Sequence, residues 1–439
     1  MLVPELLAPA GTPAHLETAF AYGADAVYAG QPRYSLRVRN NSFKDLSSLA
    51  AGINRAHQLG KQFYLVSNIA PHNDKVRSYL RDLEPMIELQ PDALIMSDPG
   101  LIMMVRERWP DQPIHLSVQA NAVNWATVEF WRRQGISRVI LSRELALEEI
   151  REIRERVPAM ELEVFVHGAL CMAYSGRCLL SGYMNHRDAN QGACTNACRW
   201  NYREVSHSHD QTGDLIARSS DSAPQTVQPR EILLEEPNRP GGFIPVYEDE
   251  HGTYIMNSKD LRAIQHVQAL CRMGIHSLKI EGRTKSTYYV ARTTQTYRRA
   301  IDDAVAGKPF DMSLMDQLEA LSNRGYTEGF LRRHPPKEYQ SYEQGSSHLG
   351  TQQLVGTLLD DDDRWLTIEV KNRFAPGDTL ELVTPAGNLQ FATDTMETGN
   401  GTRLDYAPGS GYTVRIPRPA NTPAQLHHSY LTRIIQSER

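Results

Sequence analysis

Short apolar runs alternate with helical patterns over the first 285 residues of the chain. Each run is β-branched or aliphatic and ends in polar residues, and most are followed by a segment with apolar positions at helical spacing. The runs lie at residues 5–9, 26–30, 62–68, 93–98, 114–121, 138–142, 162–167 and 277–281. Such alternation is typical of βαβ units and a parallel sheet. Eight units favour a closed (β/α)8 barrel of the TIM type, although an open sheet fits the same pattern.

The segments between the runs predict the surrounding helices. The predicted helices lie at residues 12–22, 43–59, 75–88, 126–134 and 147–157, and a last one at 286–306 closes the barrel. Asn41 and Ser42 precede the second of these helices and are predicted to cap it. The fold class is therefore α/β.

An insertion and a second domain complete the predicted organisation. The insertion, about 168–275, separates the seventh run from the eighth and holds a cysteine-rich loop and a predicted hairpin at 243–256. With this insertion included, the barrel domain is predicted over residues 1–335. Residues 350–439 instead show short strand-like runs separated by Gly, Asn and Asp turns, which predicts a small C-terminal β-barrel domain.

Polar residues end almost every predicted strand. Active sites of α/β barrels lie at the C-terminal ends of the strands, and so many polar ends are hard to explain as core. The polar residues are Tyr28, Asn68, Asp98, Gln119, Asn121, Arg143, Glu144, His167, Glu281 and Arg283.

Composition narrows the classes of protein. The chain has 439 residues, of which 41% are hydrophobic, and it contains no apolar stretch long enough to cross a membrane. Its apolar start lacks the basic region of a signal peptide, so we expect a cytoplasmic protein without a membrane partner. The formal charge of −5 argues against binding of nucleic acid through a general positive field, but a local basic patch remains compatible with an RNA partner.

Four of the five cysteines fall within 28 residues, in the pattern Cys-x6-Cys-x15-Cys-x3-Cys. They are Cys171, Cys178, Cys194 and Cys198. Clustered cysteines in a cytosolic chain indicate metal or redox chemistry. Four thiolates suit zinc or a [4Fe–4S] cluster, and the absence of tight Cys-x2-Cys pairs favours iron–sulfur, with unligated buried thiols as the third interpretation. Cys271 lies in a helical pattern at 261–273 and is predicted to be a core residue.

Several motifs resemble the U32 peptidase family. They are LAPAG at 7–11, GADAVYAG at 23–30, EVFVHGALC at 163–171, SGRCLLS at 175–181, NSKDL at 257–261 and LKIEGR at 278–283. The likeness covers the barrel almost end to end, and the C-terminal domain resembles the extra domain of longer members. Within the family the chain is most similar to the tRNA hydroxylases that make 5-hydroxyuridine at the wobble position with prephenate. Residues 185–200 and 324–330 carry this finer resemblance.

The resemblance implies a set of cofactors and partners. It places ligands of a [4Fe–4S] cluster at Cys171, Cys178 and Cys194, with Cys198 to complete the set. Arg262 stands where some relatives have a further cysteine, which leaves the fourth ligand open. It also implies prephenate as co-substrate, tRNA as substrate, and the iron–sulfur assembly machinery as a partner.

The strand ends then acquire expected roles. Prephenate carries two carboxylates, which the planar guanidinium of Arg143 and Arg283 suits; the alternative is a salt bridge to Glu144 or Glu281. Glu281 is expected to act as a catalytic base, or else to hold Arg283 or Lys285. His167 is expected to transfer protons, or else to be a buried, hydrogen-bonded histidine.

Other polar residues are candidates for RNA contacts. Asn68, Gln119 and Asn121 can pair with the edge of a uracil, the alternative being structural hydrogen bonds within the barrel. The loop after the second strand combines basic residues with an aromatic one and is expected to bind phosphate and stack on a base, unless it is only a solvated charged loop. These residues are Arg33, Tyr34, Arg37 and Arg39.

Two other functions compete with RNA modification. The family name suggests a peptidase, but the sequence shows no nucleophile with a base at motif spacing and no His-Glu-x-x-His. Cys171 or Cys178 can form a thiol pair with His167, although ligation of a cluster would remove that thiolate. The third function is hydroxylation of another aromatic substrate, which the β domain and the finer motifs disfavour.

Overall fold

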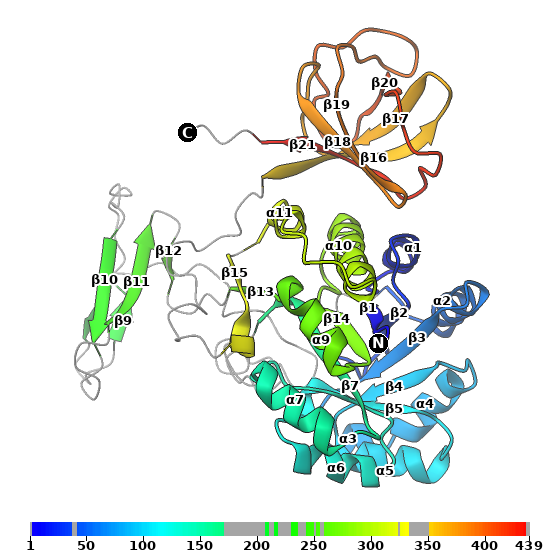
Figure 1. Cartoon of the computed structure of the whole chain (residues 1–439), viewed down its shortest axis with the longest axis vertical. Coiled ribbons are helices and arrows are strands. Elements are labelled where there is room, and N and C mark those ends of the chain that lie inside the picture. Colours follow the sequence, from blue (N-terminus) through cyan, green and yellow to red (C-terminus); the bar gives the residue numbers. More distant parts are fainter. Residues whose placement is uncertain are drawn as a thin grey trace.

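The computed structural model describes residues 2–36, 42–170, 259–323, 325–332 and 351–435, together with the backbone of five short strands between residues 207 and 254. Figure 1 shows a barrel surrounded by helices and a smaller β domain beside it. In the described part of the chain, no helix is both long and apolar enough to span a bilayer.

The eight predicted strands form a closed parallel barrel. They are β1 (Glu5–Pro9), β2 (Ala26–Gly30), β3 (Gln62–Ser67), β4 (Ala93–Met96), β5 (Ile114–Leu116), β6 (Arg138–Ile140), β7 (Glu161–Ala169) and β14 (Ser277–Ile280). Each strand is parallel to its neighbours, and β14 pairs with both β1 and β7, which closes the barrel. The predicted TIM-type fold is confirmed. Several strands are shorter than predicted because their polar tails leave the sheet, as where β5 gives way to the 3-10 turn η2 (Val118–Ala120).

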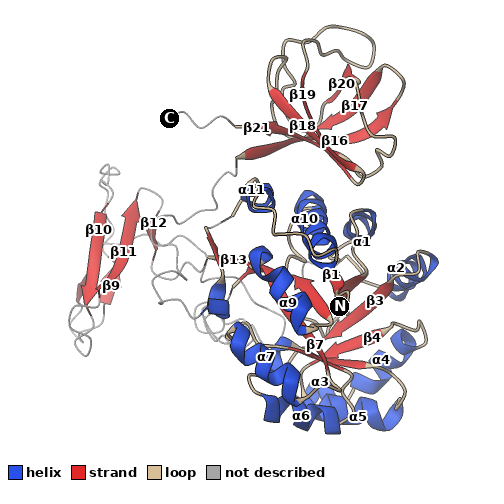
Figure 2. Ribbon diagram, viewed as in Figure 1, coloured by secondary structure: helices blue, strands red, loops and turns tan. Residues whose placement is uncertain are grey.

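Helices surround the barrel (Figure 2), and their inner faces complete one large apolar core. They are α1 (Pro13–Ala21), α2 (Leu46–Gln58), α3 (Asn73–Val76), α4 (Tyr79–Ile87), α5 (Pro99–Arg108), α6 (Trp125–Arg133), α7 (Leu147–Arg156), α9 (Val267–Met273), α10 (Thr287–Val305) and α11 (Ser313–Glu319).

Three details of the helix prediction are wrong. The cap of α2 is Asp45, whose carboxylate accepts a hydrogen bond from the Ser48 amide at 2.8 Å, and not Asn41 or Ser42. The predicted helix at 75–88 is divided into α3 and α4. The pattern at 261–273 begins in a strand, β13 (Asp260–Arg262), because Leu261 pairs with Gly168 at the end of β7 and only the later residues are helical.

The further strands between β7 and the C-terminal domain lie in the insertion, except β15, which follows α11. β13 runs antiparallel to β7 and is joined by β15 (Tyr326–Thr327). β11 (Phe243–Asp249) and β12 (Gly252–Tyr254) pair antiparallel with Asp249 opposite Gly252, which confirms the predicted hairpin. The remaining strands of the insertion are β8 (His207–His209), β9 (Leu215–Ala217) and β10 (Arg230–Glu235).

The C-terminal domain is a separate antiparallel sheet, as the turn pattern predicts. Its strands are β16 (Gln352–Asp361), β17 (Trp365–Val370), β18 (Thr379–Thr384), β19 (Gly387–Ala392), β20 (Thr413–Pro417) and β21 (Tyr430–Ile434). They follow the order β19-β18-β21-β16-β17-β20. Inward residues such as Ile368, Leu382 and Val414 are fully buried in a core of the domain's own.

A buried ion pair fastens this domain to the helices of the barrel. Arg292 of α10 is 1% exposed; its guanidinium donates to Glu381 of β18 at 2.7 Å and to Gln352 of β16 at 2.8 Å. Beside it, the Tyr22 hydroxyl at the end of α1 donates to the carbonyls of Val383 and His428, both at 3.0 Å. The β domain therefore docks against α1 and α10.

Replacing Arg292 by methionine is expected to destabilise the protein by about 3 kcal/mol, because the Glu381 carboxylate remains buried without its cation. Urea unfolding of the full chain measures the loss. The double variant Arg292→Met/Glu381→Gln is expected to recover part of it, since the stranded charge is gone. Losses in Arg292→Met and in Glu381→Gln that add up in the double variant would contradict a coupled pair.

Candidate functional site at the barrel mouth

Charged side chains meet inside the barrel. Arg138, the first residue of β6, donates to Glu5 at 2.7 Å and to Glu161 at 2.9 Å, and its guanidinium lies 3.4 Å from Glu163. Glu163 is fully buried, and it accepts a hydrogen bond from the Lys279 Nζ of β14 at 2.8 Å. Burial lowers the pKa of Lys279, and the Glu163 carboxylate opposes this effect.

Two aromatic rings, those of Tyr28 and Phe165, lie beside the Lys279–Glu163 pair, and each ring has cations close to it. The Lys279 Nζ is 4.4 Å from the ring centroid of Tyr28 and 5.3 Å from that of Phe165. The Arg143 Cζ lies 3.8 Å from the Phe165 centroid, and the Arg283 Cζ lies 5.5 Å from the Tyr28 centroid. Arg143 and Arg283, predicted from their places at the strand ends, thus lie on neighbouring rings at the barrel mouth.

The salt bridges considered as alternatives for Arg143 are not formed. Within the described residues, Arg143 has no carboxylate within ion-pair distance, and Glu144 instead accepts a hydrogen bond from the Ser142 hydroxyl. Arg283 is 8% exposed and donates to the Ser35 hydroxyl at 2.9 Å. Arg143 is therefore a half-buried cation whose guanidinium edge is available to an anionic ligand.

Glu281 lies at the same mouth, with its backbone against β7. Its carboxylate accepts a hydrogen bond from the Tyr28 hydroxyl at 3.0 Å, and its amide donates to the His167 carbonyl at 2.9 Å. Gly168 has a φ of +106°, and a Cβ there would lie 2.5 Å from the Glu281 carbonyl oxygen. Only glycine permits this close approach, which brings the end of β7 beside Glu281.

His167 points away from the mouth. Its ring is 1% exposed and packs against Tyr289, Tyr297 and Tyr326, with centroid distances of 5.8, 5.5 and 5.5 Å. The Tyr297 hydroxyl is 3.4 Å from Nδ1, and Nε2 has no partner among the described residues. Burial, assisted by the charge of Lys285, lowers the pKa of His167 to about 3. The ring is therefore neutral near pH 7. This fits the alternative in which His167 is a buried histidine, and it does not fit a role in proton transfer.

The three amide residues take different positions. Asn68 is buried; its Nδ2 donates to the Ser117 hydroxyl at 3.2 Å, which fits the structural alternative. The Gln119 carbonyl oxygen accepts from the Ser97 hydroxyl at 3.3 Å, and its NH2 has no partner among the described residues. Asn121 adopts a left-handed conformation with a φ of 52°. Gln119 is thus the residue of the three with a donor to offer to a base.

The loop after β2 differs from the prediction at Tyr34. Its ring is 1% exposed, and its hydroxyl donates to Asp82 at 2.7 Å, so that no face of the ring is open to a base. Arg33 is half exposed and donates to the same carboxylate at 2.8 Å. Arg37 and Arg39 lie outside the described residues. Stacking on Tyr34 therefore has no support in this conformation.

The four predicted cluster ligands, Cys171, Cys178, Cys194 and Cys198, also lie outside the described residues. Over the described ranges, no three His, Cys, Asp or Glu side chains come together as a metal site. Cys271 is 1% exposed, and burial raises the pKa of its thiol to about 11, so its predicted place in the core is confirmed. Arg262, at the position of a cysteine in some relatives, pairs with Glu319 and covers the Tyr326 ring at 4.7 Å.

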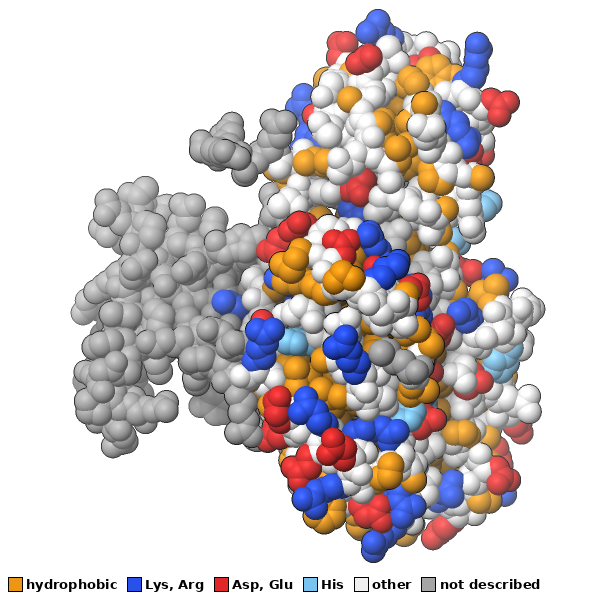
Figure 3. Space-filling view, viewed as in Figure 1, with side chains coloured by type: hydrophobic (Ala, Val, Ile, Leu, Met, Phe, Trp, Pro, Cys, Tyr) orange, Lys and Arg blue, Asp and Glu red, His pale blue; other side chains and the backbone are white. Residues whose placement is uncertain are grey.

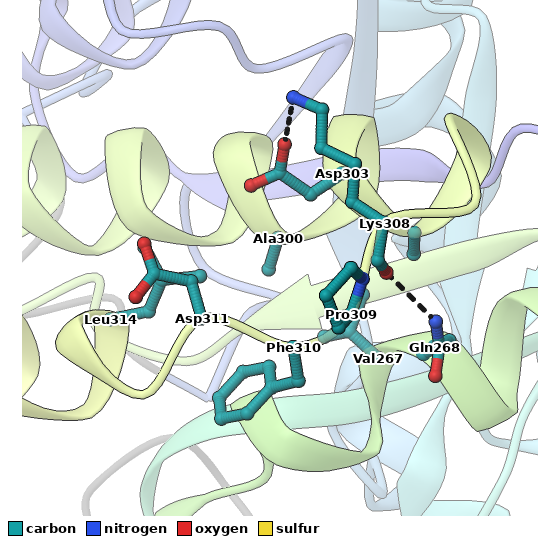
Figure 4. Close-up of a pocket in the computed structure, with 10 residues that line it drawn as sticks. Val267, Gln268, Ala300, Asp303, Lys308, Pro309, Phe310, Asp311 and Leu314 are labelled. Carbon is teal, nitrogen blue, oxygen red and sulfur yellow. Dashed lines mark hydrogen bonds and ion pairs between the residues drawn. The ribbon is translucent and has the colours of Figure 1, made fainter.

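The surface outside the barrel mouth shows mixed charges and a small hollow. Figure 3 shows basic and acidic side chains interspersed over the face of the molecule that it presents. A small hollow between α9 and α10 is lined partly by Pro309 and Phe310, and at its edge Lys308 pairs with Asp303 at 2.7 Å (Figure 4). This hollow is on the outer layer, away from the strand ends.

Sequence reasoning missed Lys279, Glu163 and Phe165. All three lie inside the predicted strands rather than at their polar ends, so they were not among the candidates. A signal was nevertheless present, because Glu163 and Phe165 alternate with aliphatic residues along β7, and Lys279 interrupts the apolar run of β14. Charged residues at period two in a barrel strand indicate the lumen side.

Comparison with known proteins assigns the family. The family model of peptidase family U32 matches residues 11–341, and that of the U32 C-terminal domain matches residues 350–433. The chain belongs to the U32 peptidase family. This U32 chain is 59% identical, over 100% of its length and 98% of the relative's, to the tRNA hydroxylation protein P of Escherichia coli. It is 56% identical, over 97% of its length and 95% of the relative's, to the protein of that name in Haemophilus influenzae.

A more distant relative is named for the modification of a different RNA. The 23S rRNA 5-hydroxycytidine synthase of Escherichia coli is 30% identical to this chain over 78% of its length, and the match covers 44% of that relative. The predicted resemblance to the U32 family is thereby confirmed.

Proposed function

We propose that this U32 protein is a tRNA hydroxylase that converts the wobble uridine into 5-hydroxyuridine, with prephenate as co-substrate. The observation that carries the proposal is identity of 59% and 56%, over nearly the whole chain, to two relatives named for tRNA hydroxylation. Action on tRNA supports a cytoplasmic location for the enzyme. The motifs at 185–200 and 324–330 support the wobble uridine as the site of hydroxylation.

The barrel mouth suits a small dicarboxylate. Arg143 is held over Phe165 without a carboxylate partner in the described residues, and Arg283 covers the adjacent Tyr28. Guanidinium groups bind carboxylates through paired hydrogen bonds, and aromatic rings accommodate the hydrocarbon body between them. Prephenate combines two carboxylates with a six-membered ring, so it matches the chemistry of this surface.

The same mouth offers groups to an unpaired base. The Gln119 amide donor can meet a carbonyl of uracil, and Glu281, held by Tyr28, is a carboxylate at the same mouth. A base at the wobble position is unpaired in a free anticodon and can enter a pocket without the cost of opening a helix. Glu281 is then placed to accept a proton, whereas His167 is not.

The four cysteines at 171–198 are the residues proposed to hold a [4Fe–4S] cluster. β7 ends at Ala169 beside Glu281, so the chain enters the cysteine segment from the mouth. The donor set fits the cofactor, because four thiolates are the usual ligands of such a cluster. When bound, the cluster would supply electron transfer or a Lewis-acidic iron. Its assembly would need the iron–sulfur machinery as a partner.

The peptidase alternative finds little support. A hydroxyl–imidazole contact does exist at Thr12 and His15, with 2.6 Å between Oγ1 and Nδ1. However, Thr12 caps α1, and the His15 Nε2 bonds to the Lys285 carbonyl at 2.8 Å, which makes the pair a structural one. Burial also lowers the pKa of His15.

Heterologous complementation tests the function. The chain is expressed in an Escherichia coli strain lacking its 59% identical relative, and the nucleosides of total tRNA are analysed by liquid chromatography and mass spectrometry. We expect 5-hydroxyuridine, or a nucleoside derived from it, to be lost with empty vector and restored by the chain. Unchanged tRNA in this strain, together with 5-hydroxycytidine restored by the chain in a second strain that lacks the 23S rRNA 5-hydroxycytidine synthase, would instead reassign the chain to ribosomal RNA.

A further inference from the structure

Lys279 lies one residue before the end of β14, inside the barrel and beneath the two arginines. The residue is 3% exposed and is opposite Phe165 in the register of β14 and β7. Its ammonium group lies between the Tyr28 and Phe165 rings, 4.4 and 5.3 Å from their centroids. Arg143 and Arg283 contact the same two rings, so three cations lie around them.

The hydrogen bonds of Lys279 are incomplete. An ammonium group has three donors. Only one acceptor, the Glu163 carboxylate at 2.8 Å, is found for it among the described residues. A buried donor without an acceptor is costly, so a ligand that brings an acceptor to this ammonium group would be favoured.

The local charges point in the same direction. Arg138 has two carboxylates of its own, Glu5 and Glu161, apart from its longer contact with Glu163. Lys279 therefore shares its carboxylate, Glu163, with Arg138, and Arg143 has no carboxylate partner among the described residues. An anion bound at the rings would add a partner for both Lys279 and Arg143.

We propose that Lys279 is a substrate-binding residue: it receives the inner carboxylate of a cyclic dicarboxylate whose outer carboxylate binds Arg143. Glu163 acts as the positioning residue that keeps the ammonium group between the rings. The assignment rests on the proposed use of prephenate for the identity of the ligand, but not for the existence of the anion site. The substrate class it defines is a small dianion with a ring of about the size of benzene.

Binding to the full chain, purified without oxygen, tests the proposal by calorimetry with two probes, prephenate and phthalate. Lys279→Met is expected to weaken binding about 10- to 100-fold, as for loss of a hydrogen bond to a charged group. Lys308→Met is the matched control, because Lys308 also pairs with one carboxylate but lies on the outer layer. It is expected to bind both probes like the wild type.

A double variant separates binding from structure. If Lys279 only neutralises Glu163, Lys279→Met/Glu163→Gln would bind like the wild type, and the proposal would be overturned. We expect this variant to be as weak as Lys279→Met while unfolding near the wild-type temperature, since no unpaired carboxylate remains. It also keeps the test valid if the single variant fails to fold.

The two probes distinguish the failure of this inference from that of the proposed function. Binding of phthalate that depends on Lys279, without binding of prephenate, would keep the anion site and reject prephenate as co-substrate. Wild-type protein that binds neither probe, or a double variant that binds as tightly as the wild type, would reject the role of Lys279.

Discussion

Replacing Arg143 by alanine is expected to raise the Kd for prephenate about 100-fold or more and to raise KM in the same proportion. The reason is that Arg143 is held 3.8 Å over Phe165 and has no carboxylate partner in the described residues, so that its pairing capacity is kept for the ligand. Truncating one partner of a desolvated charge pair costs several kcal/mol. Calorimetry with prephenate and steady-state assays on tRNA measure the two effects.

Two further variants show whether the effect depends on the guanidinium group and on its position. Arg143→Lys keeps the charge but loses the planar fork, and it is expected to recover only part of the affinity. Arg133→Ala removes a surface arginine of α6 that pairs with Glu129, and it is expected to change neither constant. Unaltered prephenate affinity in Arg143→Ala would contradict the placement of the co-substrate at the mouth.

Serine at any of the four clustered cysteines is expected to abolish hydroxylation and to remove most of the about four irons expected per chain. The four positions are Cys171, Cys178, Cys194 and Cys198. Iron and sulfide analysis of protein purified without oxygen, with its visible spectrum, measures the loss. Cys271→Ser is the matched control, because Cys271 is buried in α9 and is expected to retain the full cluster.

The iron content of Cys198→Ser, compared with that of the other three variants, tests which residue is the fourth ligand. The family resemblance leaves the fourth ligand open, and at the alternative position stands Arg262, whose guanidinium pairs with Glu319. Retention of all the iron in Cys198→Ser, with loss in the other three variants, would show that a different residue completes the site. One zinc and no sulfide in the wild type would contradict the iron–sulfur proposal altogether.

The fold was predictable because the barrel strands are buried on both faces and appear as separate apolar runs. α5 was not predicted because its apolar residues follow those of β4 after a short interval, so the two elements do not appear as separate patterns. Its start was nevertheless marked, with Asp98 capping the Leu101 amide at 2.9 Å and Pro99 at the first position.

The candidate site was predictable only in part. Arg143, Glu281 and Arg283 were found because a strand end in an α/β barrel defines a position in space. Tyr34 was misplaced because the direction of a side chain in a loop follows no period; its ring turns inward to Asp82. Lys279 was missed because its partner, Glu163, is 116 residues away in sequence, and only the barrel register brings the two together.

The most direct test of the account is reconstitution of the reaction. Protein purified without oxygen, with its iron and sulfide content measured, is incubated with tRNA from the strain lacking the relative, with and without prephenate, and the nucleosides are analysed by mass spectrometry. The account predicts a nucleoside one oxygen heavier than uridine at the wobble position, formed only with prephenate and greatly reduced in Arg143→Ala. Unmodified tRNA in the presence of prephenate and intact cluster, or equal modification without prephenate, would contradict it.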